Sequence, residues 1–137
     1  MNRYRLFLDA NVLFTAAHNP DGKAAFLITL ANDGYWQVVT SDLAIEEVRR
    51  NLERKYPRAM AQLEVLLNAV RIVASPAVTD SPINLPEKDR PIFAAARSCR
   101  ATHLLTGDRK HFGPFFNQPQ ICAGIMIQTV SDFLAAI

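Results

Sequence analysis

The chain alternates short apolar runs with segments in which apolar residues recur at helical spacing. Short aromatic and aliphatic runs bounded by turn residues are typical of buried strands. Such runs occur at 4–8, 36–40, 71–74 and 103–106, and a shorter run at 125–128 predicts a fifth strand. Apolar residues three and four positions apart predict helices at 23–32, from Ser41 to a break at Pro57, from there to about Ala69, from Pro91 to about Arg100, and at 131–137. The segment 109–112 is predicted to form a single helical turn.

Residues with strong local preferences mark where these elements begin and end. Ser41 is a good N-cap, Pro91 fits the first turn of a helix, and Gly34 is a natural helix stop. The segment 75–89 (SPAVTDSPINLPEKD) combines prolines with Asp, Ser and Asn, which predicts a loop. Strands separated by helices imply right-handed crossovers and a parallel sheet with helices on both faces. We therefore predict an α/β fold, a three-layer α/β/α sandwich around a central parallel sheet of four to five strands.

Length and composition add the broad class of protein. The 137 residues match one ordinary domain without repeat or linker, so we expect a single domain over 1–137. No apolar run approaches the roughly 20 residues of a membrane helix, so no membrane association is expected. The N-terminal apolar stretch is short and ends at Asp9, which argues against a signal peptide and leaves the cytoplasm as the expected location. Cys99 and Cys122 stand alone, so neither a disulfide nor a zinc site is expected.

Charge does not by itself name a ligand. With 15 Lys and Arg against 13 Asp and Glu, the net charge of +2 falls short of the basic excess that many nucleic-acid-binding domains carry. Basic residues nevertheless gather between Arg49 and Arg58 and again at 109–111. This distribution is compatible with an RNA substrate but does not establish one.

Four acidic residues map to one edge of the predicted sheet. Asp9 follows the first strand and Asp108 follows the fourth, and open α/β sheets bind ligands outside the carboxyl ends of their strands. Glu47 lies one helical turn beyond the second strand, and Asp89 lies at the entrance of the helix before the fourth. Clustered carboxylates raise one another's pKa unless cations hold them ionised. Oxygen ligands of this kind suit Mg²⁺ or Mn²⁺, and such ions support phosphodiester hydrolysis.

Each acid also has a structural explanation when it is considered alone. Asp9 fits an Asx-turn, and Asp89 fits a helix N-cap. Asp108 fits a cap of the turn after the fourth strand, and Glu47 fits an ion pair with an arginine on its own helix. Caps and surface ion pairs have no reason to share one edge of the sheet, however. The shared edge therefore favours a metal site over four separate structural roles.

Four segments resemble, in this order, the signature blocks of the PIN domain family: LFLDANVLF, SDLAIEEVRRNL, PEKDRPIFAAA and HLLTGDRKHF. The resemblance extends from Tyr4 to the final helix after Gly124, and the length is close to that of VapC-like toxins. It implies a parallel α/β/α sandwich and metal-dependent cleavage of RNA. The catalytic and metal-binding residues that the resemblance implies are Asp9, Glu47, Asp89 and Asp108.

The resemblance also distinguishes neighbouring candidates. Glu47 is preferred to Glu46 because the family's acid directly precedes the Val or Ile of its "EV" pair. Adjacent helical residues point about 100° apart, so Glu46 is expected in solvent. Asn11 and Thr106 match polar positions beside the family's acids, where they are expected to orient a carboxylate or hold a water. Ser41 matches as well, although N-capping explains it adequately.

The segment after Asp108 has two interpretations. Arg109, Lys110 and His111 are expected to contact the RNA backbone, or the segment is simply a polar turn at the surface. Some members of the family carry a further acid near this segment, whereas 109–111 supplies none. The number of cations, one or two, therefore stays open.

VapC-like toxins suggest a biological role. The resemblance implies the toxin of a toxin–antitoxin pair, with RNA as substrate, a cognate antitoxin protein as partner and a homodimer as the assembly. Two alternatives are a solitary PIN nuclease in RNA processing and a catalytically silent, RNA-binding PIN-like module. A haloacid-dehalogenase-like phosphatase also begins with a strand that ends in Asp. That chemistry requires a second Asp where this chain has Asn11, which excludes the class.

Overall fold

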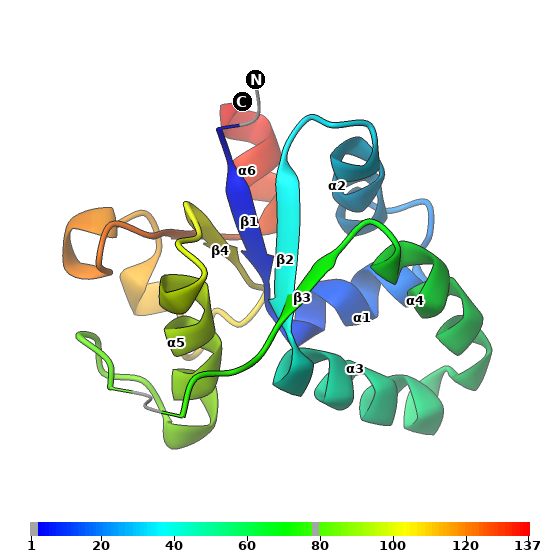
Figure 1. Ribbon diagram of the computed structural model, residues 1–137, viewed down its shortest axis with the longest axis horizontal. Coiled ribbons are helices and arrows are strands. Elements are labelled where there is room, and N and C mark those ends of the chain that lie inside the picture. Colours follow the sequence, from blue (N-terminus) through cyan, green and yellow to red (C-terminus); the bar gives the residue numbers. More distant parts are fainter. Residues whose placement is uncertain (1–2, 78–79) are drawn as a thin grey trace.

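The structure is a computed structural model that describes residues 3–77 and 80–137 (Figure 1). Its strands are β1 (Arg5–Leu8), β2 (Gln37–Ser41), β3 (Arg71–Val73), β4 (His103–Leu105) and β5 (Met126–Gln128). Its α-helices are α1 (Ala10–His18), α2 (Lys23–Asn32), α3 (Asp42–Lys55), α4 (Met60–Leu67), α5 (Arg90–Ser98) and α6 (Val130–Ala136). Short 3-10 helices are η1 (Pro57–Ala59), η2 (Glu87–Asp89), η3 (Gly113–Phe115) and η4 (Pro119–Ile121).

The strands of the described residues form one parallel sheet with the order β3-β2-β1-β4-β5. The chain moves outward from β1 to β2 and β3, then crosses back to β4 and β5 on the other side of β1. The strand order therefore reverses between β1 and β4, which is where open α/β sheets form their ligand crevice. The predicted central parallel sheet is confirmed, with the fifth strand present.

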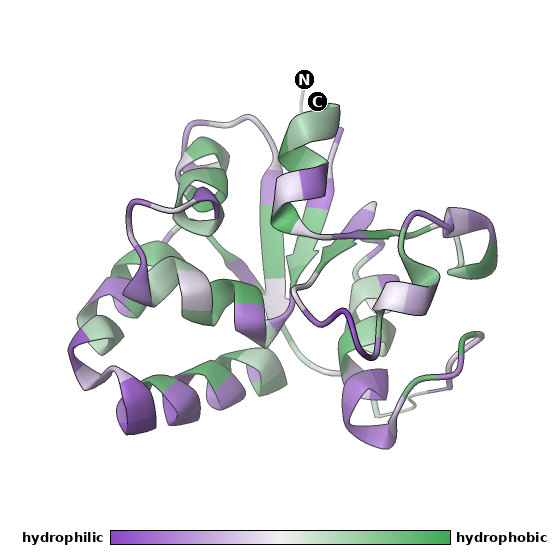
Figure 2. Ribbon diagram, turned by 180° about the vertical axis from the view of Figure 1, so that it is seen from behind, coloured by the Kyte–Doolittle hydropathy of each residue, from purple (hydrophilic) through white to green (hydrophobic). Residues whose placement is uncertain are grey.

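Helices cover both faces of the sheet, with α5 on one side and α1, α2 and α4 on the other (Figure 1). Strands buried on both faces read as continuous apolar runs, and Leu6, Phe7 and Leu8 of β1 are each 0% exposed. Figure 2 shows hydrophobic strands at the centre and hydrophilic residues along α3 at the edge of the molecule. The predicted three-layer α/β/α sandwich is confirmed.

Helix α1 is a correction to the sequence-based prediction, which contains no helix between β1 and residue 23. The signal was present, because the buried residues of this segment recur on one helical face. They are Ala10, Val12, Leu13, Ala16 and Ala17. Asp9 is the N-cap, and its carboxylate accepts a hydrogen bond from the Ala10 N–H at 2.7 Å. Strand β1 and helix α1 thus meet at the acid itself, with no loop between them.

The other predicted elements are present, with small shifts at their ends. Ser41 caps α3 as predicted, because its Oγ accepts a hydrogen bond from the Ala44 N–H at 3.2 Å. Pro57 separates α3 from α4 by beginning η1. Segment 109–112 forms a single turn with hydrogen bonds of helical spacing, from the Phe112 N–H to the Asp108 carbonyl at 3.1 Å and from the Gly113 N–H to the Arg109 carbonyl at 3.0 Å.

In the predicted loop at 75–89, the described residues form no helix or strand until η2 begins at its end. Positions 78–79 of this loop and positions 1–2 of the N-terminal stretch lie outside the described residues. None of the helices in the described part of the chain has the length and apolar character needed to span a membrane.

Candidate active site

A cavity lies at the carboxyl ends of β1 and β4, where the strand order reverses. Its volume is about 710 Å³. Residues from α1, α2, α3, η2, α5, the turn after β4 and the beginning of α6 line it. All four acids that the sequence singled out lie on its wall: Asp9, Glu47, Asp89 and Asp108. The tertiary structure therefore brings together side chains that are distant in sequence.

Asp9 is buried at the junction of β1 and α1, with 6% of its surface exposed. Its Oδ1 accepts the hydrogen bond from the Ala10 N–H, and its Oδ2 accepts hydrogen bonds from Thr106 Oγ1 at 2.9 Å and Asn11 Nδ2 at 3.1 Å. Burial raises the pKa of Asp9 to about 6, although the hydrogen bonds from Thr106 and Ala10 oppose it. Two neighbouring carboxylates raise the pKa further. A nearby cation would offset this cost of ionisation.

Asn11 and Thr106 hold the Asp9 carboxylate in place. Thr106 Oγ1 donates to Asp9 and also accepts a hydrogen bond from the Asp108 N–H at 3.0 Å. Asn11 Oδ1 accepts a hydrogen bond from the Gly107 N–H at 2.7 Å. A Cβ at Gly107 would lie 3.3 Å from Asn11 Oδ1, so glycine permits this close approach. These side chains link the beginning of α1 to the turn after β4.

Asp89 directly precedes α5 but makes no side-chain capping hydrogen bond. It is 9% exposed, and its Oδ2 has no hydrogen-bond partner among the described residues. Burial raises the pKa of Asp89; His111 and Lys88 oppose this effect, and Asp108 adds to it. The N-cap explanation therefore fails for Asp89. Buried polar groups in folded proteins are nearly always paired. The ion-pair contact of Asp89 Oδ2 is with His111 Nδ1, at 3.3 Å.

Asp108 occupies the turn after β4 together with His111. Its Oδ1 accepts a hydrogen bond from the His111 backbone N–H at 3.0 Å, and its Oδ2 lies 2.8 Å from His111 Nδ1. Burial alone would raise the pKa of Asp108, but the hydrogen bonds with His111 bring it below its ordinary value. Asp108 therefore caps its turn, as its structural explanation predicts, and also lines the cavity.

His111 joins the acids in a way that the sequence analysis missed. Ligand atoms of Asp89, Asp108 and His111 all lie within 4.8 Å of one another. From the sequence, His111 was expected either to contact the RNA backbone or to belong to a polar turn, not to face the acids. The available signal was the spacing from Asp108, because one turn of backbone returns position i+3 to the side of position i.

Glu47 and Glu46 occupy different sides of α3. Glu47 lines the cavity, and its charge raises the pKa of Asp9. Glu46 lies in a separate hollow beside Ile72 and forms an ion pair with Arg50 at 3.4 Å. The side of α3 that faces the cavity is therefore the side that carries Glu47.

The profile of the PIN domain matches residues 5–110, a segment that contains all four acids. The chain belongs to the PIN domain family. A comparison with curated proteins found no match.

Solved structures with a similar fold to this PIN domain include complexes and toxins from three bacteria. VapBC2 of Rickettsia felis, bound to a DNA fragment from its promoter, matches with a TM-score of 0.67 and 14% identity over 91% of this chain and 98% of that one. Mycobacterium tuberculosis VapC20, described as a toxin that cleaves the sarcin–ricin loop, has a TM-score of 0.56 and 17% identity over 77% and 91%. VapBC-1 of nontypeable Haemophilus influenzae has a TM-score of 0.57 and 16% identity over 93% and 98%. At these identities the likeness shows a shared fold.

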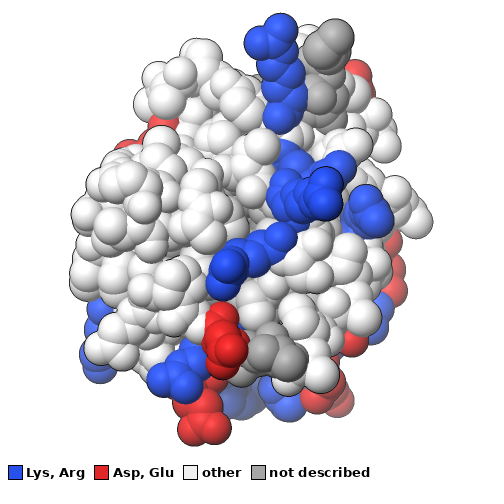
Figure 3. Space-filling view, turned by 60° about the vertical axis from the view of Figure 1, so that its left-hand side comes forward, with Lys and Arg blue, Asp and Glu red and all other residues white. Residues whose placement is uncertain are grey.

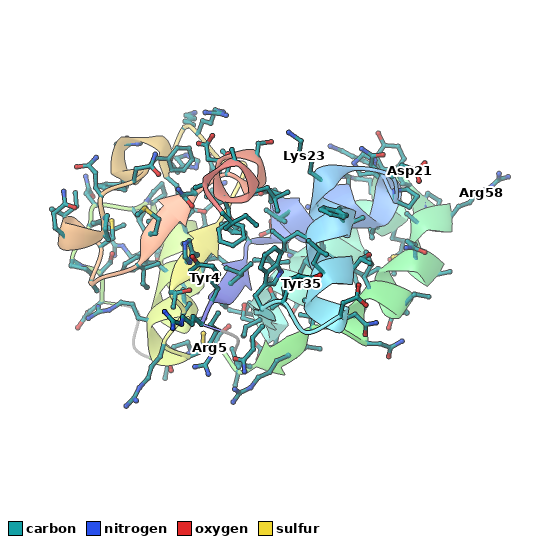
Figure 4. All side chains as sticks on the ribbon, turned by 90° about the horizontal axis from the view of Figure 1, so that it is seen from above. Tyr4, Arg5, Asp21, Lys23, Tyr35 and Arg58 are labelled. Atoms are coloured by element: carbon teal, nitrogen blue, oxygen red, sulfur yellow. The ribbon has the colours of Figure 1, made fainter. Side chains whose placement is uncertain are left out.

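The cavity of this PIN domain also contains positive charge that the sequence analysis did not place there. Lys23 of α2 and Lys88 of η2 line it, and Figure 4 shows Lys23 projecting from the beginning of α2. Arg109 and Lys110, the predicted RNA contacts, are exposed on the turn and are not among the described residues that line the cavity. Ser41 is likewise outside the described wall and serves as the cap of α3.

The donor set of this PIN domain fits a hard divalent cation. Carboxylate oxygens are the ligands that Mg²⁺ and Mn²⁺ prefer. Among the described residues, Asp89 Oδ2 is buried without a hydrogen-bond donor, and burial raises the pKa of Asp9 to about 6. A cation between these carboxylates would pair with Asp89 Oδ2 and lower the pKa of Asp9.

Proposed function

We propose that this chain is a metal-dependent ribonuclease that hydrolyses RNA phosphodiester bonds. The observation that carries the proposal is the convergence of Asp9, Glu47, Asp89 and Asp108 on one cavity. Capping does not explain Asp89, whose Oδ2 is buried without a hydrogen-bond donor among the described residues. Membership of the PIN domain family supports nuclease chemistry for such a site.

The acids and their neighbours have separate roles in this proposal. Asp9, Glu47, Asp89 and Asp108 would hold Mg²⁺ or Mn²⁺, which when bound supplies an activated water and neutralises charge on the attacked phosphate. Asn11 and Thr106 are positioning residues, because both donate hydrogen bonds to Asp9 Oδ2 and fix the direction in which its carboxylate faces. Burial keeps bulk water away from Asp9, which strengthens its interaction with a cation.

Positive side chains at the cavity suit an anionic polymer. Lys23 and Lys88 line the cavity from two different elements, α2 and η2, so each is available to a phosphate near the acids. Arg109 and Lys110 are exposed on the neighbouring turn, where we propose that they contact more distant phosphates. Such contacts position a nucleic acid and make its binding depend on salt.

The biological role that we propose is that of a toxin in a toxin–antitoxin pair, acting on RNA in the cytoplasm. The similar solved structures are named as a VapC toxin or as VapBC complexes, which supports an antitoxin protein as partner. We propose a homodimer as the assembly, which light scattering of the purified chain measures directly. A solitary nuclease in RNA processing is the alternative, and it requires no antitoxin.

Cleavage of RNA by the purified chain tests the activity. Structured and single-stranded RNAs are incubated with Mg²⁺ or Mn²⁺, with and without chelator, beside Asp9→Asn. We expect cleavage only with the metal and the native Asp9, because the substitution removes a charged oxygen ligand. Cleavage that survives both the chelator and Asp9→Asn would contradict the mechanism.

Glu47 and Glu46 provide a matched pair on one helix. Glu47→Gln removes a carboxylate from the cavity, whereas Glu46→Gln removes one that pairs with Arg50 outside it. We expect a loss of RNA cleavage of about tenfold or more for Glu47→Gln and little change for Glu46→Gln. Equal effects of the two substitutions would remove Glu47 from the site.

Expression in living cells tests the toxin role separately from the chemistry. Induction of the native chain is expected to arrest growth, while Asp9→Asn is expected to be harmless at the same protein level. Co-expression of a cognate antitoxin is expected to restore growth and to form a stable complex with the chain. RNA cleavage in vitro without growth arrest would favour the solitary nuclease.

A further inference from the structure

The turn after β4 brings an imidazole nitrogen against two of the carboxylates. His111 Nδ1 lies 2.8 Å from Asp108 Oδ2 and 3.3 Å from Asp89 Oδ2. The His111 backbone N–H donates to Asp108 Oδ1 at 3.0 Å, and the Phe112 N–H donates to the Asp108 carbonyl at 3.1 Å. These two hydrogen bonds hold the backbone of the turn, so the imidazole starts from a defined position beside the acids.

The distances match those between neighbouring ligands of one ion. Two ligands at right angles, each about 2.1 Å from a cation, are about 3.0 Å apart. The two distances from His111 Nδ1, 2.8 Å and 3.3 Å, lie on either side of that value. Ligand atoms of all three residues lie within 4.8 Å of one another. Only small side-chain movements are needed to place a cation among them.

The hydrogen bond between His111 and Asp108 uses the Nδ1 of the ring and leaves Asp89 Oδ2 with a longer contact to the same nitrogen, at 3.3 Å. Asp89 is 9% exposed, and among the described residues nothing donates a hydrogen bond to its Oδ2. Buried polar groups in folded proteins are nearly always paired. Asp89 Oδ2 and Asp108 Oδ2 thus face one imidazole nitrogen, which can donate a proton to only one of them, whereas a cation at this place would serve both carboxylates.

We propose that His111, Asp89 and Asp108 form a mixed nitrogen–oxygen metal subsite that binds Mn²⁺ in preference to Mg²⁺. The proposal rests on the proposed metal-dependent nuclease and names its preferred cation. Carboxylates alone suit both ions, whereas an imidazole ligand favours a transition metal. Asp9 and Glu47 offer oxygen only. His111 is not among the described residues that line the cavity, but its ring reaches Asp89 and Asp108 from the adjoining hollow and is the nitrogen ligand that would separate the two ions.

Pulsed electron paramagnetic resonance of Mn²⁺ bound to the full chain, without RNA, tests the ligand directly. An imidazole ligand produces ¹⁴N modulation of the Mn²⁺ signal, which we expect for the native chain and not for His111→Gln. His18→Gln is the matched control among the three histidines, because His18 stacks on Tyr56 with ring centroids 4.6 Å apart. His111→Asn serves as a second variant that retains a hydrogen-bond donor but lacks the ring.

Competition between the two ions supplies a second measurement. Loss of even an outer-shell partner of a metal ligand costs about 10- to 100-fold in affinity. We therefore expect His111→Gln to weaken Mn²⁺ binding by at least about tenfold and Mg²⁺ binding by less. The ratio of Mn²⁺ affinity to Mg²⁺ affinity is then smaller in the variant than in the native chain. Circular dichroism confirms that each variant is folded.

The outcomes separate this subsite from the proposed ribonuclease. The subsite is overturned if Mn²⁺ does not bind, or if it binds without ¹⁴N modulation. It is also overturned if the modulation persists in His111→Gln. A role of His111 in positioning Asp108 alone predicts reduced activity without nitrogen modulation. ¹⁴N modulation without RNA hydrolysis overturns the proposed ribonuclease but supports the subsite. Metal-dependent RNA hydrolysis without ¹⁴N modulation supports the ribonuclease but overturns the subsite.

Discussion

Strand β4 is preceded by Thr102 and followed by Thr106, and both hydroxyl groups connect β4 to β1. Thr102 Oγ1 accepts a hydrogen bond from the Arg5 N–H at 3.0 Å and donates one to the Arg5 carbonyl at 3.1 Å. Thr106 Oγ1 instead donates to the buried carboxylate of Asp9 at 2.9 Å. The same residue type thus completes main-chain pairing at one edge of the sheet and positions an acid at the other.

The two edges differ in how completely their polar groups are paired. At the amino edge, Arg5 Nη1 donates to the Cys99 carbonyl at the end of α5 at 2.6 Å, and its Nε donates to Gln37 Oε1 at 2.9 Å. A positive charge at a helix C-terminus is stabilising. At the carboxyl edge, Asp9 is ionised only at a cost and Asp89 Oδ2 lacks a donor among the described residues. The Arg5 side chain at the first edge is paired, whereas Asp9 and Asp89 at the second carry charge that burial disfavours.

Charge also differs between the two edges, although Lys23 and Lys88 line the cavity beside its acids. Figure 3 shows a row of Lys and Arg side chains down one face of the molecule. Burial raises the pKa of the Cys99 thiol, and the positive charges of Arg5 and Arg71 both oppose this effect. The acids of the cavity belong to the opposite ends of the strands. Buried polar groups whose hydrogen bonds are incomplete therefore mark the candidate functional site. The edge with a structural role alone has its polar groups paired.

The largest expected effect is at Asp89. Asp89→Asn removes a carboxylate that is proposed to hold the cation, so RNA cleavage is expected to fall by more than about a thousandfold. The metal-free protein is expected to be at least as stable as the native chain, because a buried charge is lost. Initial rates of cleavage and urea unfolding with chelator measure the two effects. Asp132→Asn is the control, because Asp132 is an exposed acid of α6. A similar loss of cleavage in this control would contradict a specific role for Asp89.

The next effect is the pH dependence of stability without metal. The pKa of Asp9 is raised from 3.8 to about 6 in the folded chain, so between these values the folded state keeps a proton that the unfolded state has lost. The free energy of unfolding is therefore expected to fall as pH rises through this window and to level off above it. The expected decrease is about 2 to 3 kcal/mol.

Urea unfolding with chelator between pH 4 and pH 8 measures this dependence. Asp9→Asn is expected to show a weaker decrease and to be more stable than the native chain at pH 8, while losing RNA cleavage. Equal pH dependence in both proteins would show that Asp9 does not carry the effect. The linkage would then lie with the other carboxylates of the cavity.

The two threonines beside β4 allow the same substitution at both edges. Thr106→Val removes a hydrogen bond to Asp9 and is expected to reduce RNA cleavage by about 10- to 100-fold, as expected for a group that orients a metal ligand. Thr102→Val is expected to lower the free energy of unfolding by about 1 kcal/mol and to leave cleavage unchanged. Cleavage rates at saturating metal, together with urea unfolding, separate the two. Equal losses of RNA cleavage in Thr106→Val and Thr102→Val would contradict a catalytic role for one edge of the sheet and a structural role for the other.

The smallest effect is expected at Arg5. Arg5→Ala removes the hydrogen bonds to Cys99 and Gln37 and is expected to cost about 1 to 2 kcal/mol of unfolding free energy without changing cleavage by the folded protein. Arg58→Ala is the control, because Arg58 projects away from the body of the molecule (Figure 4). Thermal unfolding compares the variants. An Arg5→Ala protein with native stability would show that this edge is not held by its side chains.

Local patterns predicted much of this molecule and failed at identifiable places. The strands and most helices were predicted because their apolar spacing reflects which face is buried. Helix α1 was missed because an Asp after a strand is equally compatible with a turn and with a helix N-cap, both of which use the same side-chain-to-backbone hydrogen bond. Lys23 and Lys88 at the cavity, and His111 beside Asp89 and Asp108, were missed because helix packing and turn geometry decide which side chains meet.

The sequence by itself determined the α/β class, the PIN family blocks and the edge of the sheet at which the acids gather. This was possible because parallel strands share one direction, so residues that follow them must emerge together. Only the tertiary structure decided the partners of each acid. Asp9 and Thr106 are 97 positions apart, yet they share a hydrogen bond, while Asp89 sits at a capping position without capping. Such pairings depend on distances between elements, which no local pattern contains.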